Sequence, residues 1–156
     1  MELCTLPYDH PDAVKLIAEL QQVFVVRYGD EDVTPVDPAQ FAAPAGHFVV
    51  GYLDGDPVAC GGWRAHDEVL DSLRPGDAEI KRMYVVDALR GRGLSRLVLT
   101  ALEDAARAVG RRRMVLETGD RQPEAIGLYT RAGYTRIDNF GVYRDHPNSL
   151  CFAKEL

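Results

Sequence analysis

The sequence has few cysteines, and their placement argues against both a disulfide framework and a zinc site. Only three occur in 156 residues, namely Cys4, Cys60 and Cys151. An odd number cannot pair completely, and no CxxC motif or Cys/His spacing typical of zinc ligands is present. We therefore expect reduced thiols, a cytoplasmic protein and no bound metal.

Long apolar runs and an excess of positive charge are also missing. No stretch approaches the roughly 20 consecutive apolar residues that cross a bilayer, and Met1–Cys4 lacks the basic and apolar regions of a signal peptide. With 24 acidic and 18 basic residues the formal net charge is −6, whereas nucleic acids are bound through basic faces. The sequence thus predicts neither a membrane nor a nucleic-acid partner.

The composition is that of an ordinary globular domain. Hydrophobic residues make up 46% and charged residues 27% of the chain. A chain of this length buries a core large enough to fold without disulfides or metals. Since no repeat or linker is present, we expect a single domain over residues 1–156.

Hydrophobic periodicity and turn residues divide the chain into helices, strands and loops. Helices are expected at 12–27, 94–109 and 123–132, and strands at 47–53, 58–64, 78–86, 114–116, 134–137 and 150–153. Segment 28–46 carries several prolines and acids, which indicates a long loop with one helical turn around Gln40 and Phe41. The predicted order of elements is β α loop β β β α β α β β. Strands and helices are mixed in it without strict alternation, which predicts an α+β layered domain.

A loop rich in glycine and arginine separates a predicted strand from the clearest predicted helix. Its sequence, DALRGRGLS, spans residues 87–95. The unpaired N–H groups of a helix N-terminus carry positive partial charge and bind phosphate oxygens. Gly91 and Gly93 let the main chain approach a ligand, and the neighbouring arginines add charge-assisted hydrogen bonds. A lone GxG motif favours a structural turn, but the strand-loop-helix setting favours an anion site suited to a pyrophosphate.

The same segment resembles motif A of the GNAT superfamily of N-acetyltransferases. Arg90, Gly91 and Gly93 match its pattern Arg/Gln-x-x-Gly-x-Gly/Ala, and Ser95 replaces the last small residue. Met83–Val85 is similar to the end of the family's preceding strand. The resemblance implies that backbone N–H groups of the loop hold the pyrophosphate of coenzyme A. It also implies that the pantetheine arm pairs with the backbone of Met83–Val85 as an added strand.

A second match lies downstream, where AIGLYTRAGY, starting at Ala125, resembles the family's A-x-x-L-Y-x-x-x-G-F/Y helix. Gln122 stands where the family often has an asparagine that touches the coenzyme. The resemblance implies a GNAT fold, with a mixed, mostly antiparallel twisted sheet of six to seven strands flanked by about four helices, and acetyl-CoA as cosubstrate. The residues expected to contact acetyl-CoA are Met83, Tyr84, Val85, Arg90, Gly91, Arg92, Gly93, Leu94, Ser95 and Gln122.

The resemblance also assigns a general acid, Tyr129, which protonates the departing thiolate. An alkyl thiol has a pKa of about 8.5 and a phenol one of about 10, so this proton transfer is only modestly uphill. From the sequence alone, the alternative is that Tyr129 packs beside Leu128 with its hydroxyl in water.

A carboxylate is expected to accept the proton of the attacking amine, directly or through water. Glu79, on the strand leading into motif A, is the first candidate, and Glu117 at the end of the next strand competes with it. Glu79 is equally consistent with a surface carboxylate paired with Lys81 or Arg82. The apolar residues of this strand change parity near Lys81 and Arg82, which predicts a β-bulge there.

The expected reaction is direct transfer of acetyl to the primary amine of a small molecule within a ternary complex. A protein lysine or N-terminus as the acceptor is the alternative within enzymes, and a non-catalytic acyl-CoA sensor is the alternative outside them. Members of the family often pair as homodimers, and the resemblance extends that expectation to this chain.

Overall fold

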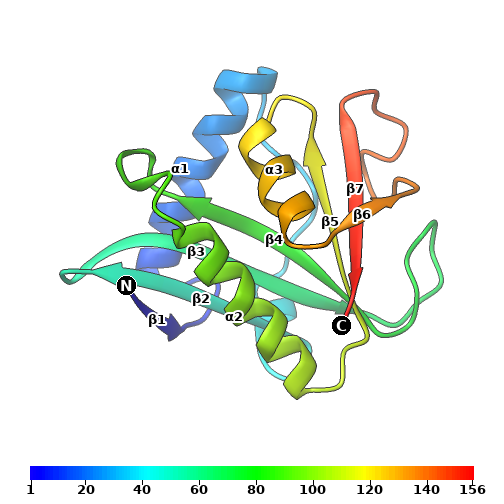
Figure 1. The fold of residues 1–156 in the computed structure, drawn as a ribbon, viewed down its shortest axis with the longest axis horizontal. Coiled ribbons are helices and arrows are strands. Elements are labelled where there is room, and N and C mark those ends of the chain that lie inside the picture. The colour runs from blue at the N-terminus through cyan, green and yellow to red at the C-terminus, as the bar shows by residue number, and fades with distance from the viewer.

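The computed structural model describes residues 1–156 and contains one seven-stranded sheet with the order β1-β2-β3-β4-β5-β7-β6 (Figure 1). The strands are β1 (Glu2–Thr5), β2 (Gly46–Leu53), β3 (Asp56–His66), β4 (Asp77–Val85), β5 (Arg113–Gly119), β6 (Thr135–Ile137) and β7 (Ser149–Glu155). The α-helices are α1 (Pro11–Tyr28), α2 (Leu94–Ala108) and α3 (Pro123–Arg131), and the 3-10 helices are η1 (Pro38–Phe41) and η2 (Asp87–Leu89).

The predicted α+β class and the sheet of six to seven strands are confirmed. Three α-helices and two 3-10 helices stand in place of the expected four or so helices. Each predicted helix and strand overlaps an observed one, and the helical turn expected around Gln40 and Phe41 is η1. No helix combines the length and the apolar composition needed to cross a membrane.

The sheet is covered on both faces. Helices α2 and α3 pack on one face through the largest hydrophobic cluster, which includes Val98, Leu102 and Tyr129. Helix α1 covers the other face through Ala13 and Leu16 (Figure 1). This two-sided burial follows from the amphipathic stripes of the helices.

Strands β4 and β5 are the only parallel neighbours in the sheet. Their pairing ends early, at Glu79 opposite Val115. Beyond this point the two strands separate, and α3 lies over the opening (Figure 1). The β5-facing backbone edge of β4 from Ile80 to Val85 therefore has no strand partner and is free to pair with an extended ligand.

The predicted β-bulge is present in β4. Cys60 of β3 pairs with Tyr84, and Gly62 pairs with Lys81, so two residues of β4 oppose Gly61 alone. Arg82 has a φ of 61°, an unusual conformation for a residue with a side chain.

The bulge places two consecutive cations on one face of the sheet. The apolar residues around it, Ile80, Met83 and Val85, join the cluster beneath α2. Lys81 and Arg82 both contact the loop that follows α1, on the opposite face. Without the extra residue, these two neighbouring side chains would point to opposite faces.

Candidate active site

A cavity of about 890 Å³ opens between β4 and β5. Its walls come from the C-terminal end of α1, the following loop, the N-termini of α2 and α3, and the segment before β7. One half is bounded by the glycine loop and α2, and the other by the loop after α1 and by Tyr143. Two chemically different subsites therefore share one space.

The glycine loop has the conformation that an anion site requires. Gly91 and Gly93 have φ values of 79° and 78°, which an L side chain rarely adopts. Helix α2 starts at Leu94 without a side-chain cap. The first amide to bond back along the helix is that of Leu97, which donates to Gly93 O at 3.3 Å. The N–H groups of Leu94, Ser95 and Arg96 are thus free for a ligand.

Most of the residues expected to contact acetyl-CoA line this cavity. They are Met83, Tyr84, Val85, Arg90, Gly91, Gly93, Leu94, Ser95 and Gln122. Arg92 does not line it; this residue lies exposed at the tip of the loop, between the two glycines. Arg96 and Arg131 do line it, although neither was among the predicted contacts. Their side chains reach the cavity from the first turn of α2 and the last of α3.

Gln122 links the cavity wall to the β5–α3 turn. Its side-chain oxygen accepts hydrogen bonds from Gly119 N at 3.2 Å and from Thr118 Oγ1 at 3.3 Å. The Tyr28 hydroxyl also donates to this oxygen, at 3.4 Å. The oxygen is therefore used within the protein, and the amide nitrogen is the part of Gln122 left for a ligand.

Tyr129 lies on α3, in the cavity wall, and only 5% of its surface is exposed. Its ring packs edge-on against Tyr134, with centroids 5.5 Å apart. Its hydroxyl donates to no protein group, whereas the Tyr134 hydroxyl donates to Glu103 Oε2 at 2.9 Å. Burial raises the pKa of Tyr129, so this phenol remains protonated at neutral pH. It thus carries a proton to donate, and the same rise makes transfer of that proton to a thiolate more uphill than for an exposed phenol.

Glu79 is buried and already paired. Its Oε1 accepts a hydrogen bond from Arg64 Nε at 2.9 Å and lies 2.8 Å from His66 Nε2. Burial raises its pKa, but the His66 hydrogen bond and the charges of Lys81 and Arg64 outweigh this effect and lower it to about 2. Glu79 does not line the cavity. Its environment is that of a structural ion pair.

Glu117 has the properties of a base poised near neutral pH. It lines the cavity from β5, where that strand has separated from β4. No cation lies within ion-pair distance of its carboxylate. Burial raises its pKa to about 7, with Asp32 adding to the rise and Lys81 opposing it. Such a group accepts protons efficiently at physiological pH.

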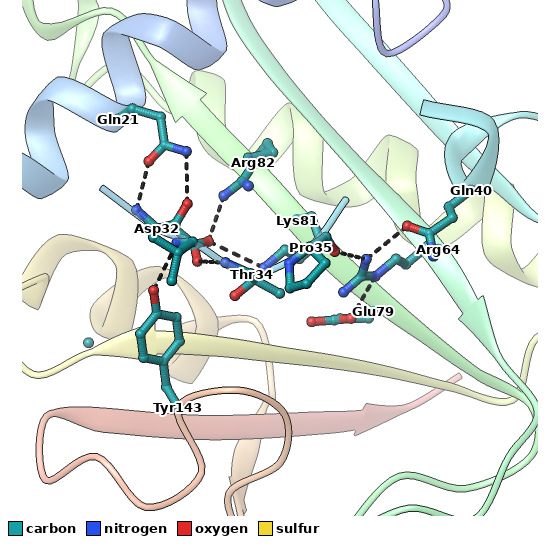
Figure 2. A network of polar contacts seen from close by, with 12 residues as sticks. Gln21, Asp32, Thr34, Pro35, Gln40, Arg64, Glu79, Lys81, Arg82 and Tyr143 are labelled. Carbon is teal, nitrogen blue, oxygen red and sulfur yellow. Dashed lines mark hydrogen bonds and ion pairs between the residues drawn. The ribbon is translucent and has the colours of Figure 1, made fainter. Parts of the chain in front are cut away.

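A polar network holds the loop after α1 over the other half of the cavity (Figure 2). Asp32 Oδ2 accepts from Arg82 Nη1 at 2.6 Å and from Lys81 Nζ at 3.4 Å. Gln21 brackets the Asp32 main chain, accepting from its N at 2.9 Å and donating to its O at 3.2 Å. Tyr143 reaches across from the segment before β7, and its hydroxyl accepts from Val33 N at 2.9 Å.

Asp32 and Tyr143 were not predicted to belong to this network. One signal was available, namely the predicted bulge at Lys81 and Arg82, which places both cations on one face. The counter-ion, however, lies in a loop 50 residues away from Arg82 in the chain. No group of His, Cys, Asp and Glu side chains in the structure could hold a metal ion.

Comparison with known proteins agrees with this geometry. The Acetyltransferase (GNAT) family matches residues 14–134, and the chain belongs to this family. It is therefore an N-acetyltransferase by family, in line with the expectation from motif A.

Individual relatives span nearly the whole chain. An "IAA acetyltransferase" of Azospirillum brasilense is 35% identical over 143 residues, which cover 92% of this chain and 90% of that protein. A crystal structure of an acyl-CoA N-acyltransferase from Klebsiella pneumoniae superposes with a TM-score of 0.80 at 28% identity, covering 99% of this chain and 97% of the other. A GNAT acetyltransferase from Elizabethkingia anophelis, solved with acetyl-CoA bound, has a TM-score of 0.69 at 14% identity, with 99% and 97% covered.

Proposed function

We propose that this enzyme transfers acetyl from acetyl-CoA to the primary amine of a small molecule, by direct attack within a ternary complex. One observation carries the proposal. A single cavity joins the free N–H groups of α2 to a carboxylate and a phenol suited to proton transfer. The first feature suits a pyrophosphate, and the second pair suits aminolysis of a thioester.

Binding of acetyl-CoA, the acetyl donor, relies on backbone groups at the glycine loop and α2, which border the part of the cavity that we call the donor half. The N–H groups from Gly91 to Arg96 face the pyrophosphate, and the unpaired edge of β4 hydrogen-bonds the pantetheine arm. Arg96 and Arg131 supply positive charge for the phosphate of coenzyme A that lies outside the pyrophosphate. The bound acetyl-CoA of the Elizabethkingia structure supports the choice of donor.

Proton transfers are assigned to two side chains. Glu117 accepts the proton of the attacking amine, because its raised pKa leaves it about half ionised near pH 7. Tyr129 donates its proton to the departing thiolate. Backbone N–H groups of β4 near the bulge polarise the thioester carbonyl. Glu79 pairs with Arg64, whose Nη1 donates to Pro35 O at 2.9 Å in the loop after α1, and the low pKa of Glu79 makes it a poor proton acceptor.

The loop after α1 and Tyr143 cover the part of the cavity that we call the acceptor half, and this cover supports a small molecule over a protein. The loop after α1 crosses this half and is fastened from β4 and from Tyr143. A second clamp joins α1 to the β5–α3 turn, where Arg27 Nη1 donates to Arg121 O at 3.1 Å and Arg121 Nη1 to Arg27 O at 2.9 Å. A protein lysine or N-terminus needs an open groove at this position.

The decisive test is an initial-rate study with acetyl-CoA and a panel of small amines, following the release of free thiol. Direct transfer predicts intersecting double-reciprocal plots and an acetylated amine detectable by mass spectrometry. Parallel plots would contradict the ternary complex. Tight acetyl-CoA binding without turnover of any small amine or peptide would favour the non-catalytic sensor instead.

A further inference from the structure

The acceptor half of the cavity contains two cations but only one carboxylate paired with them. Side-chain exposure is 9% for Lys81, 5% for Arg82 and 15% for Asp32. Asp32 is the only carboxylate within 4.0 Å of either cation. A positive charge is therefore left uncompensated in a site that is largely sheltered from water, and such a charge is costly unless a ligand balances it.

Several hydrogen-bond donors of this cluster are also unfilled. Lys81 Nζ has one protein acceptor, Asp32 Oδ2 at 3.4 Å, although an ammonium group carries three N–H donors. Arg82 uses Nη1 for Asp32 and Nε for the Tyr8 hydroxyl at 3.2 Å, which leaves Nη2 without a protein acceptor. The Lys81 and Arg82 donors line the same cavity as Glu117.

No other acid near the cavity is paired with Lys81 or Arg82. Glu117 has a pKa near 7 and faces the cavity without an ion-pair partner. Glu79 is occupied by Arg64 and His66. Asp30 and Glu31 line the cavity only as exposed residues. The vacant donors therefore suit an anionic group that arrives with the substrate.

We propose that the acceptor is a primary amine that carries its own carboxylate, as an amino acid does. Its carboxylate is bound by Lys81 and Arg82, and its amine lies at Glu117. This inference rests on the proposed function and narrows its substrate class. The β-bulge is the structural reason for this selectivity, because it turns both cations toward the same face.

The test compares L-amino acids with their carboxamides, for example leucine, phenylalanine and methionine with leucinamide, phenylalaninamide and methioninamide. The amide keeps the shape and removes the charge. Selectivity is the ratio of kcat/KM for the acid to that for the amide, measured with each enzyme variant. Because each substrate has the same amine pKa with every variant, differences in amine basicity cancel when variants are compared.

Three lysine variants separate charge recognition from other effects. Lys81→Met removes the charge at similar length and should lower the selectivity roughly 10- to 100-fold, as expected for loss of a charge-assisted hydrogen bond. Lys81→Arg keeps the charge and should retain most of the selectivity for the acid. Lys15→Met, at an exposed site on α1, is the matched control and should leave it unchanged. Thermal unfolding and acetyl-CoA affinity check that Lys81→Met is folded.

A second measurement needs no variant. N-acetyl-L-amino acids and N-acetyl-L-amino acid amides lack a titratable amine, so their inhibition constants against the wild-type enzyme are directly comparable. The acids should inhibit roughly 10-fold more strongly or better, for the same reason. Equal inhibition by both would overturn the inference.

The outcomes distinguish this inference from the proposed function. If amides or simple amines are acetylated as well as the acids, and Lys81→Met slows all of them equally, carboxylate recognition is refuted and the acetyltransferase activity stands. If acetyl-CoA binds but no amine of either kind is acetylated, the small-molecule function fails, and the inference fails with it.

Discussion

Asp32 Oδ2 accepts a hydrogen bond from Arg82 Nη1 at 2.6 Å, and this contact joins the loop after α1 to the bulge of β4. It connects the wall of the acceptor half to the strand that borders the donor half. The positions of the loop and of the two cations are therefore coupled, and the contact explains how a polar loop is held at a fixed place.

Removal of this contact should destabilise the protein. Asp32→Asn leaves Lys81 and Arg82 without a counter-ion, and the free energy of unfolding should fall by about 3 kcal/mol, as for other broken buried pairs. Burial raises the pKa of Asp32, but the charges of Lys81 and Arg82 outweigh it and hold that pKa below its usual range. The stabilisation is thus present above the unfolded-state pKa and is lost as the pH falls. Urea unfolding at pH 7 and at pH 3 should show a smaller difference between the two proteins at the lower pH.

Asp30→Asn is the control, because Asp30 is an exposed neighbour in the same loop. Its free energy of unfolding should match that of the wild type. Equal stability of Asp32→Asn and Asp30→Asn at pH 7 would mean that the Asp32 pairs contribute nothing.

Glu117→Gln should abolish most of the activity and the pH dependence that accompanies it. Loss of a general base lowers kcat/KM by about 10²-fold or more. In the wild type, kcat/KM should fall as the pH drops below 7, because protonated Glu117 cannot accept a proton. Rate profiles from pH 5.5 to 9 check both effects, and Glu79→Gln, as the comparison, should retain the limb near pH 7. If the limb near pH 7 disappeared in Glu79→Gln and persisted in Glu117→Gln, Glu79 and not Glu117 would be the general base.

Glu117→Gln, which lowers activity, should increase the stability of the fold at high pH. The folded-state pKa of Glu117 is about 7, above the unfolded value of about 4.3, so its stabilising contribution is complete below pH 4 and lost as the pH rises through 7. At pH 8, Glu117→Gln should therefore be more stable than the wild type, by about 1–3 kcal/mol. Melting curves at pH 8 and pH 5 test this, and a gain that is no larger at pH 8 would contradict the raised pKa.

Gly93→Ala should weaken acetyl-CoA binding beyond its effect on folding. Gly93 and Gly110, at opposite ends of α2, have φ values of 78° and 80°, and at both positions the space that a methyl group would occupy is open. Alanine at either site should cost about 1–2 kcal/mol of stability through the left-handed backbone alone. Calorimetric titration should show lower acetyl-CoA affinity for Gly93→Ala only. Equal affinity for both variants would remove the loop from the binding site.

Tyr129→Phe should lower kcat by about 10²-fold while leaving acetyl-CoA affinity unchanged, since the lost hydroxyl acts on the leaving thiolate. Tyr134→Phe provides the contrast, because its hydroxyl bonds to Glu103 and lies outside the cavity lining. This second variant should lose about 1–2 kcal/mol of stability and keep its turnover. Thiol-release assays and urea unfolding of both variants distinguish the roles. Full activity of Tyr129→Phe would exclude it as the general acid.

The glycine loop and the helix that it opens could be predicted from the sequence because their signals are local. Gly91 and Gly93 are adjacent to the helix whose N-terminus they open, and the apolar stripe of that helix is visible in the sequence. The bulge also left a local trace, in the changed parity around Lys81. Arg96 and Arg131 were missed because their reach toward the cavity depends on how α2 and α3 are oriented on the sheet.

The acceptor half depended on contacts that no local pattern records. Glu79 lies on β4 and Glu117 on β5, the two strands that separate, and the sequence placed Glu79 first only through its position on the strand leading into motif A. The structure separates them through their surroundings, since Glu79 meets Arg64 and His66 while Glu117 faces an open cavity.

By itself, the sequence determined the fold class through its periodicity and the family through its resemblance to motif A and to the Leu128-Tyr129 helix, because all of these signals extend over a few residues. Only the tertiary structure decided which carboxylate is poised near neutral pH and which cations remain without a full set of partners. Burial and charge separation set those properties, and both depend on segments that are distant in the chain and meet only when it folds.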